Sequence, residues 1–381
     1  MMRKIVVVTG SRAEYGLLKP VMLRIKEHHD AELVVIATGM HMMRSKGNTI
    51  DEIKKDFSIG AEVDMGMADD QAQTLIRSLG IGIEKLVEVL ARIKPDIVLV
   101  LGDRNEALAA AITASQLMIP VAHIHGGDLT NSGTIDESIR YAITDFSHIH
   151  FAATEKSAER LKKVGEEQWR IHVTGSPAID AINSINYMSR EEIMDKFNLD
   201  ANKKFTVLIH NPVTIDPEGS FEDLKVELDT LSKMDIQAVI IYPNADRGSE
   251  RMINLIDSYE DVSTFKIHKN IPHNDFLNLL KYAAFLIGNS TSGIIEAPSL
   301  NIPVINVGER QTGREYFGYV KFIKSDSACI KKEINQILDG SFSYPETNNP
   351  YGDGSTSEKI VQILMNENLD GDILKKRKCL L

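Results

Sequence analysis

The amino-acid sequence predicts an α/β protein with two doubly wound, Rossmann-like domains that face each other across a cleft. Short apolar runs of strand composition alternate with helical patterns along the whole chain, which is typical of parallel sheets covered by helices. The alternation begins a second time after a polar stretch near the middle. With 381 residues, the chain is also long for one hydrophobic core, because single cores stop growing at about 250 to 300 residues.

The first series of elements supplies an N-terminal domain, expected at residues 1–183. Leucine and isoleucine recur at helical spacing between residues 75 and 90, and Pro95 ends that helix. Other helices are expected from residue 13, in the alanine-rich stretch after residue 104, and at 136–144 and 155–164. Residues 39–59 show a less regular pattern. Apolar runs predict buried strands at residues 4–8, 32–36, 97–101, 119–124, 149–152 and 171–173.

The second series supplies a C-terminal domain, expected at residues 204–354. A polar linker, residues 184–203, precedes this domain and carries a short helix at 190–197. A last helix, at residues 355–378, is expected to pack back on the N-terminal domain. Strands of the second series are expected at 205–209, 236–241, 262–267, 284–287 and 303–307, with helices between them.

Charge and cysteine content exclude several classes of protein. The formal net charge of −11 argues against nucleic acid or an anionic membrane surface as a partner, because those partners need a clustered basic surface. No apolar stretch approaches the roughly 20 residues of a membrane span. Cys329 and Cys379 are the only cysteines, too few for a disulfide framework or a cysteine zinc site. We therefore expect a cytoplasmic protein, and a small anionic ligand is compatible with this composition.

Two strand ends are typical of phosphate sites. Residues 9–12 follow the first strand and open a helix, so backbone amides and Arg12 can meet an anion there, although an ordinary turn fits equally well. Residues 288–296, GNSTSGIIE, favour a nucleotide more strongly, because small residues let the backbone approach a phosphate and an acidic residue follows that can take two ribose hydroxyls. The alternative is a well-capped helix. The residues concerned are Ser290, Thr291, Ser292, Gly293 and Glu296.

Acidic and imidazole side chains gather at two other strand ends. Asp103 follows one strand, His125 and Asp128 follow the next strand along the chain, and Asp136 comes shortly after. If the two strands are neighbours, their ends lie ~4.8 Å apart and these side chains converge. Carboxylates in a shared cleft can be held in different protonation states, as general acid and base catalysis requires. Arg104 beside them can bind phosphate or lower the pKa of a neighbouring carboxyl group. The alternative is that Asp103 and Asp136 only cap helices.

Histidines near these strand ends raise two further hypotheses. His123 and His125 alternate along a strand and share a face, so they are candidates for a metal site with Asp128. No metal is expected, because no third nitrogen or sulfur ligand is placed by the spacing. His210 follows a buried strand and precedes Asn-Pro, which favours a position in the cleft over a position in the core.

These motifs together resemble those of the hydrolysing UDP-N-acetylglucosamine 2-epimerases, which belong to a glycosyltransferase-B-like superfamily. The resemblance covers about residues 3–361. GTIDESIR and RQTGR are its distinctive blocks, and the EAGLRT-type and PEExNR-type blocks of the non-hydrolysing enzymes are not in the sequence. The matching blocks are SRAEYG (11–16), GDR (102–104), HIHGGD (123–128), GTIDESIR (133–140), HNP (210–212), PNADRGS (243–249), GNSTSGIIE (288–296) and GERQTGR (308–314).

The resemblance implies a site with a nucleotide side and a sugar side. It implies that Asp103, Arg104, Asp136 and the HIHGGD block surround the sugar. On the nucleotide side, it implies that Glu296 binds the ribose and that Asn244 faces the ligand. The implied diphosphate ligands are Arg12, His210, Ser290, Thr291 and Arg310.

One block departs from the family pattern. Several relatives carry glutamate where this chain has His125, and many carry glutamate where it has Asp128. The assignment of the individual proton transfers is therefore left open by the sequence. The residues implied as catalytic are Asp103, His125, Asp128 and Asp136.

The implied reaction converts UDP-N-acetylglucosamine and water into N-acetylmannosamine and UDP, as in sialic acid synthesis. It proceeds by elimination to 2-acetamidoglucal, with Asp136 or Asp103 as the base, and then by hydration. No metal or redox cofactor is implied, and the resemblance implies a homo-oligomer, either dimer or tetramer. Two alternatives stay open: the same chemistry on a UDP-2,4-diacetamido-2,4,6-trideoxyhexose of a legionaminic acid route, and a glycosyltransferase or non-catalytic nucleotide-sugar-binding protein.

Overall fold

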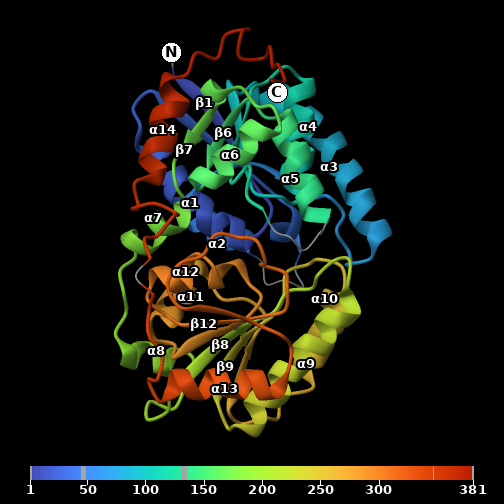
Figure 1. Cartoon of the computed structure of the whole chain (residues 1–381). Coiled ribbons are helices and arrows are strands. Elements are labelled where there is room, and N and C mark those ends of the chain that lie inside the picture. The colour runs from blue at the N-terminus through green and yellow to red at the C-terminus, as the bar shows by residue number, and fades with distance from the viewer. Residues whose placement is uncertain (1, 44–48, 130–134, 346, 380–381) are drawn as a thin grey trace.

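The computed structural model describes residues 2–43, 49–129, 135–345 and 347–379. It contains two parallel-sheet α/β domains, as the sequence predicts. Figure 1 shows the N-terminal domain, in blue and green, above the C-terminal domain, in yellow and orange. The last helix, in red, lies on the N-terminal domain.

The N-terminal sheet has seven strands within the described residues, in the order β3-β2-β1-β4-β5-β6-β7, and all neighbouring pairs are parallel. Chain order reverses direction between β1 and β4, and such a switch point opens a crevice at the carboxyl ends of the strands. β4 and β5 are neighbours, which confirms the adjacency on which the acidic cluster depends. The strands are β1 (Arg3–Thr9), β2 (Ala31–Thr38), β3 (Ile59–Val63), β4 (Ile97–Leu101), β5 (Val121–Ile124), β6 (Ile149–Ala152) and β7 (Ile171–Val173).

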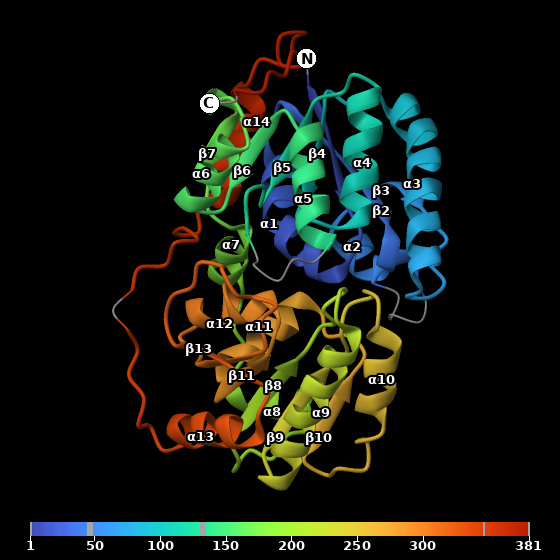
Figure 2. The same cartoon turned by 45° about the vertical axis from the view of Figure 1, so that its right-hand side comes forward.

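Helices cover both faces of this sheet, because its strands are apolar on both sides. On one face, α1 and α14 bury Leu18 and Leu364. On the other, α3, α4 and α5 pack through residues such as Leu86 and Ala110, and Figure 2 shows these three helices side by side. The helices are α1 (Arg12–Glu27), α2 (Ile50–Asp56), α3 (Ala72–Ile93), α4 (Asn105–Gln116), α5 (Ile135–Phe146), α6 (Glu155–Lys163), α7 (Pro177–Ser184) and α14 (Thr356–Asn366).

The C-terminal sheet repeats the plan with six parallel strands in the described chain, in the order β10-β9-β8-β11-β12-β13. Its switch point lies between β8 and β11. The strands are β8 (Phe205–Ile209), β9 (Gln237–Ile241), β10 (Phe265–His268), β11 (Phe285–Gly288), β12 (Val304–Val307) and β13 (Val320–Ile323). The helices are α8 (Arg190–Lys196), α9 (Pro217–Lys233), α10 (Ser249–Asp257), α11 (His273–Tyr282), α12 (Glu296–Ser299) and α13 (Ser327–Leu338).

The structure differs from the sequence prediction at two sheet edges, at one strand and at the last helix. Strands β3 and β13, both at sheet edges, were not expected. The expected strand at 262–267 is displaced, because Phe265 donates its amide to Val262 O (2.8 Å) in a turn and β10 begins only there. The last helix ends at Asn366 instead of residue 378, where the amide of Glu367 closes it on Ile363 O.

The chain after α14 is anchored to the N-terminal domain without being helical. Arg170 has a fully buried side chain and donates to the carbonyl oxygens of His148 (3.1 Å) and Ile373 (2.8 Å). Lys376 forms an ion pair with the buried Glu166 at 2.9 Å. Within the described residues, no helix is both long and apolar enough to cross a membrane.

Candidate active site

A cavity of about 350 Å³ lies between the carboxyl edges of the two sheets and is lined by both domains. Such a volume is at the lower end of the range for small-molecule sites, roughly 300 to 1,000 Å³. Twelve of the fourteen expected site residues line it: Asp103, His125, Asp128, Asp136, Arg12, Arg104, Asn244, Ser290, Thr291, Ser292, Glu296 and Arg310. His210 and Gly293 do not line it, and Gly133 and Thr134 of the GTIDESIR block lie outside the described residues.

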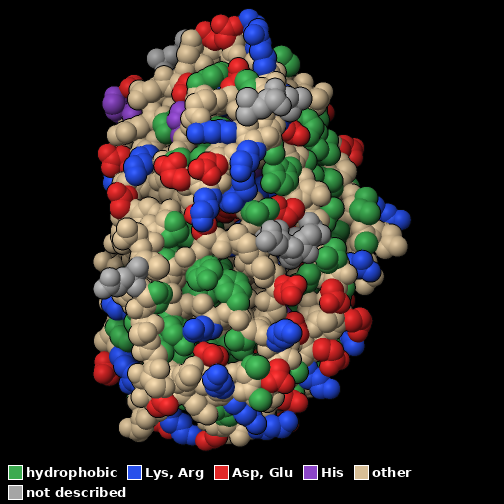
Figure 3. Space-filling model, in the orientation of Figure 1, with side chains coloured by type: hydrophobic (Ala, Val, Ile, Leu, Met, Phe, Trp, Pro, Cys, Tyr) green, Lys and Arg blue, Asp and Glu red, His purple; other side chains and the backbone are tan. Residues whose placement is uncertain are grey.

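The cavity differs from the surface in its distribution of charged side chains. On the face in Figure 3, acidic and basic side chains are intermingled over both domains. Inside the cavity, arginines converge instead: Arg12 and Arg104 come from the N-terminal domain, and Arg310 and Arg314 come from the C-terminal domain. A few arginines in a cleft suit a small anion, which the overall charge of −11 still allows.

Asp103 is held as a carboxylate by arginines. It follows β4 after Gly102, whose φ of 79° turns the chain sharply, and it forms an ion pair with Arg140 of α5. Burial alone raises the pKa of Asp103, but the charges of Arg140, Arg314 and Arg310 outweigh burial and lower this pKa below its usual value. Asp103 is therefore ionised at neutral pH.

Asp136 is shifted in the opposite direction. It lies in the first turn of α5, and burial, together with the negative charges of Asp103 and Asp246, raises its pKa to about 7, against the opposing effect of Arg310. A carboxyl group with this pKa can both accept and donate a proton near neutral pH. Two carboxyl groups of one cavity thus have pKa values pushed apart, as general acid and base chemistry needs.

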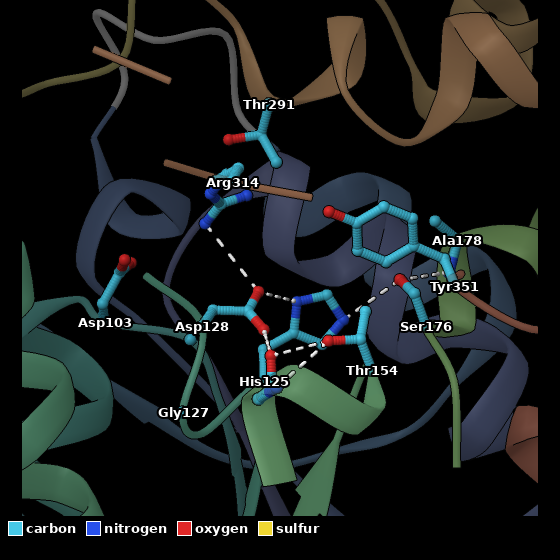
Figure 4. Close-up of polar contacts among 12 residues, drawn as sticks. Asp103, His125, Gly127, Asp128, Thr154, Ser176, Ala178, Thr291, Arg314 and Tyr351 are labelled. Atoms are coloured by element: carbon cyan, nitrogen blue, oxygen red, sulfur yellow. Dashed lines mark hydrogen bonds and ion pairs between the residues drawn. The ribbon is translucent and has the colours of Figure 1, made fainter. Parts of the chain in front are cut away.

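His125 is fixed by partners on both ring nitrogens (Figure 4). It follows β5 in a left-handed conformation with φ of 67°. Its Nδ1 lies 3.4 Å from Asp128 Oδ2, and its Nε2 lies 3.0 Å from Ser176 Oγ. Ser157 donates its hydroxyl to Asp128 Oδ1 at 2.9 Å. The Asp128 carboxylate thus faces Nδ1, where it favours the proton on that nitrogen.

Ser176, His125 and Asp128 follow the same order as a serine-hydrolase triad. Ser176, however, is fully buried, does not line the cavity and caps α7 by accepting from the amide of Ala178 (3.3 Å). A nucleophile must reach its substrate, so this serine orients the imidazole rather than attacking a ligand.

Asp128 also meets the opposite domain. Arg314 Nη2 lies 3.8 Å from Asp128 Oδ2, and Figure 4 shows it reaching the pair from the other side of the cavity. Burial raises the pKa of Asp128, but His125, Arg314 and Arg140 outweigh burial and hold this pKa well below the usual range.

The nucleotide side offers hydrogen-bond donors that lack partners. The Nη1 of Arg12 is buried and unpaired among the described residues, as are Nε and Nη1 of Arg314. Burial lowers the pKa of Arg12 to about 10, so this side chain stays cationic at neutral pH. Unpaired buried guanidinium groups are costly, and a bound anion satisfies them.

The loop after β11 forms the rest of the nucleotide side. Ser290 accepts from the amide of Ser292 (3.3 Å) and starts the 3-10 turn η4 (Thr291–Gly293). Glu296 begins α12 and lies 2.7 Å from His273 Nε2. Burial raises the pKa of Glu296, but His273 and Ser292 outweigh burial and lower it, so its carboxylate is an acceptor for hydroxyl groups.

Two histidines near the strand ends are buried and do not line the cavity. His210 is 1% exposed, its Nδ1 lies 3.0 Å from Glu227 of α9, and its Nε2 is buried without a partner among the described residues. His123 donates Nε2–H to Gly102 O (2.7 Å) and is fully buried, so it does not share a ligand site with His125. Within the described residues, the side chains with metal-ligand spacing are His28, His29 and Asp30, which do not line the cavity.

The sequence did not predict three residues that shift the pKa values of Asp103, Asp128 and Asp136. Arg140, Asp246 and Arg314 all lie within the motifs, in GTIDESIR, PNADRGS and GERQTGR, but none had been assigned a role. The available signal was that each is a charged residue within one of these blocks. Their partners are far away in sequence, so the pairing itself was not visible.

A family model described as UDP-N-acetylglucosamine 2-epimerase matches residues 23–365. The chain is 37% identical over 378 residues to the UDP-N,N'-diacetylbacillosamine 2-epimerase (hydrolyzing) of Legionella pneumophila, with 99% of each chain covered. It is 33% identical over 366 residues to the UDP-N-acetylglucosamine 2-epimerase of Neisseria meningitidis, with 96% of each covered.

A solved structure agrees with the sequence relatives. The Neisseria meningitidis UDP-GlcNAc 2-epimerase bound to UDP-GlcNAc superimposes with a TM-score of 0.77 and 25% identity, covering 96% of this chain and 100% of that one. The two facing domains are thus of the glycosyltransferase-B-like class. The chain belongs to the UDP-N-acetylglucosamine 2-epimerase family and is an enzyme of that family.

The low pKa of Asp128 predicts a pH-dependent contribution to stability. Because this pKa is lower in the folded state than in the unfolded state, ionised Asp128 stabilises the fold above the unfolded value of ~3.9, and that stability is lost as the pH falls through the folded pKa. Asp128→Asn should lower the free energy of unfolding at pH 7 by about 3 kcal/mol, the cost of breaking a buried ion pair. Urea unfolding at several pH values measures this.

The difference from wild type should shrink as the pH falls below the unfolded value. Asp261→Asn, which changes an exposed aspartate, is the control and should have little effect at any pH. A loss of stability in Asp128→Asn that is the same at pH 7 and at low pH would contradict the account.

Proposed function

We propose that this enzyme is a hydrolysing 2-epimerase that converts UDP-N-acetylglucosamine and water into N-acetylmannosamine and UDP. The observation that carries the proposal is the pair Asp103 and Asp136, whose pKa values are shifted in opposite directions beside arginines with unpaired donors. The names of the relatives support the hydrolysing mode: the proteins of Legionella pneumophila, 37% identical, and Campylobacter jejuni, 33% identical over 317 residues, are both called hydrolyzing.

In this proposal, the negative charge of the diphosphate determines how the substrate is oriented in the cavity. The diphosphate meets Arg12 and Arg310 and the hydroxyls of Ser290 and Thr291, and Glu296 accepts from the ribose hydroxyls. The sugar then lies over the strand ends of the N-terminal domain, where Asp103, Arg104, His125 and Asp136 line the cavity.

Elimination is the first step. Asp136 takes the proton from C2, the electron pair of that C–H bond forms a C1=C2 double bond, and UDP leaves C1 with the electrons of the C1–O bond. The C2 proton is only weakly acidic, so most of the negative charge develops on the departing diphosphate. The unpaired donors of Arg12 and Arg314 stabilise that charge in the transition state.

Hydration is the second step. Water adds its hydroxyl to C1 of the 2-acetamidoglucal and releases its remaining proton to solvent, while C2 receives a proton on the face opposite to the one that lost it, which inverts that carbon. We assign this proton to His125, because it lines the cavity and because Asp103 and Asp128 are held ionised.

The names of two relatives support a second candidate substrate. The Legionella pneumophila relative is named for UDP-N,N'-diacetylbacillosamine, and the Campylobacter jejuni relative is named for GDP/UDP-N,N'-diacetylbacillosamine. The same chemistry on a UDP-2,4-diacetamido-2,4,6-trideoxyhexose is therefore the alternative, and the ratio of kcat/KM for the two UDP-sugars decides between them. A cytoplasmic homo-oligomer, dimer or tetramer, completes the proposal, and sedimentation analysis tests its assembly.

Product analysis in deuterated water tests the reaction. With UDP-N-acetylglucosamine, NMR should show free N-acetylmannosamine that carries deuterium at C2, together with UDP in equal amount. A product without deuterium at C2 would exclude the elimination. Transfer of the sugar to an acceptor would indicate a glycosyltransferase, and binding of both UDP-sugars without release of UDP would indicate a sensor.

Two substitutions should separate the two steps. Asp136→Asn should lower the rate of UDP release by about 10² to 10⁴-fold, the usual value of general base catalysis, with UDP affinity unchanged. His125→Gln should still release UDP but accumulate 2-acetamidoglucal, because only the second step needs its proton. Wild-type turnover in either variant would remove that residue from its assigned role.

A further inference from the structure

Asp70 bonds across the cleft to the opposite domain. It lies in the loop between β3 and α3 of the N-terminal domain and is 6% exposed. Its Oδ2 accepts from the amides of Gly248 (3.1 Å) and Glu250 (3.0 Å) and from the hydroxyl of Ser249 (3.3 Å). These donors form the start of α10 in the C-terminal domain. A carboxylate at this end of a helix is also favoured by the helix dipole.

Helix α10 has no cap of its own. Its N-cap is Gly248, which has φ of 97° and supplies no side-chain acceptor. The first amides of a helix need an external partner, and for the amides of Gly248 and Glu250 that partner is Asp70, 178 and 180 residues away in the chain. The start of α10 is therefore fully bonded only when the two domains are together.

The capped turn also holds a charged residue of the cavity. The amide of Ser249 donates to Asp246 O at 3.0 Å, which ties the cap to Asp246. The Asp246 carboxylate lies 3.4 Å from Arg104 Nη1 of the N-terminal domain. Asp246 is one of the charges that act on Asp136. The contact made by Asp70 thus fixes the segment that faces the proposed base.

The contact lies on the opposite side of the molecule from the point where the chain crosses between the domains (Figures 1 and 2). The chain crosses between the domains beside α7, where Ser176 donates its amide to Tyr351 O (2.8 Å) and Asn183 Nδ2 donates to Asp353 O (3.2 Å). Figures 1 and 2 both show α10 on the opposite side of the molecule from α7. A rotation about the crossing point separates Asp70 from α10 before it disturbs contacts near α7.

We propose that Asp70 is a positioning residue, called the latch below, that stabilises the closed arrangement of the two domains. It caps α10 from the opposite domain and so holds Asp246 and Arg104 opposite Asp136. The role in turnover rests on the proposed function, whereas the cap itself does not. Loss of the cap leaves each domain folded but lowers the fraction of enzyme in which Asp246 faces Asp136 around the substrate, and activity falls with that fraction.

The experiment compares Asp70→Asn and Asp70→Ala with Asp216→Ala. Asp216 caps α9 within its own domain by accepting from Gly219 N at 3.0 Å, so Asp216→Ala removes a cap of the same kind without touching the cleft. Hydrogen exchange of residues 247–252 is measured with saturating UDP, and kcat and KM are measured with UDP-N-acetylglucosamine. Asp70→Glu retains the carboxylate and tests rescue.

In both Asp70→Asn and Asp70→Ala, the amides of residues 247–252 should exchange about tenfold faster, and kcat should fall about tenfold. This size corresponds to the usual contribution of an N-cap to stability. Asp216→Ala should leave both quantities unchanged, and Asp70→Glu should recover part of each. Faster exchange with unchanged kcat, or an equal loss of kcat in Asp216→Ala, would overturn the positioning role. If the wild type turns over neither UDP-sugar, the proposed function fails, and the exchange data alone decide the latch.

Discussion

Buried carboxylates need a cation close by, and the arrangement of the cleft depends on this constraint. Arg140 from α5 meets Asp103, and Arg314 from the other domain meets the Asp128 carboxylate. Both acids are thereby held ionised in a buried setting. Asp136 receives less compensation and has two negative neighbours, so it alone of the three is shifted toward the protonated form. The division of roles among the acids thus follows from which arginine lies beside which carboxylate.

This chain has His125 where several relatives carry glutamate, and the neighbours of His125 suit an imidazole. The imidazole at that position places its Nδ1 3.4 Å from the Asp128 carboxylate, whereas a glutamate would place a second carboxyl group against Asp128. The His125 ring is also oriented from the far side by Ser176, which caps α7 at the crossing between the domains. The pair His125 and Asp128 therefore forms one unit in which neither residue replaces the glutamate alone.

Much of the fold could be predicted because its strands are buried on both faces and stand out as apolar runs. Edge strands β3 and β13 were missed since Glu62 and Lys321 interrupt their apolar pattern. Most of the site could be predicted for a local reason: carboxyl ends of parallel strands meet, so residues such as Asp103 and Ser290 had to be near the crevice. The cross-domain contacts of Asp70 and Asp246, and the burial of His210 against Glu227, depend on tertiary packing, which no local pattern encodes.

The central claim is that burial, together with the charges around Asp136, raises the pKa of its carboxyl group to about 7. The pH dependence of kcat/KM tests this most directly, because it reports groups of the free enzyme. The account predicts that wild-type kcat/KM rises with pH through a group with a pKa of about 7. In Asp246→Asn this rise should move to lower pH, since a neighbouring negative charge is gone. A rise centred near the ordinary aspartate value of ~3.9 in the wild type, unmoved in Asp246→Asn, would contradict the claim.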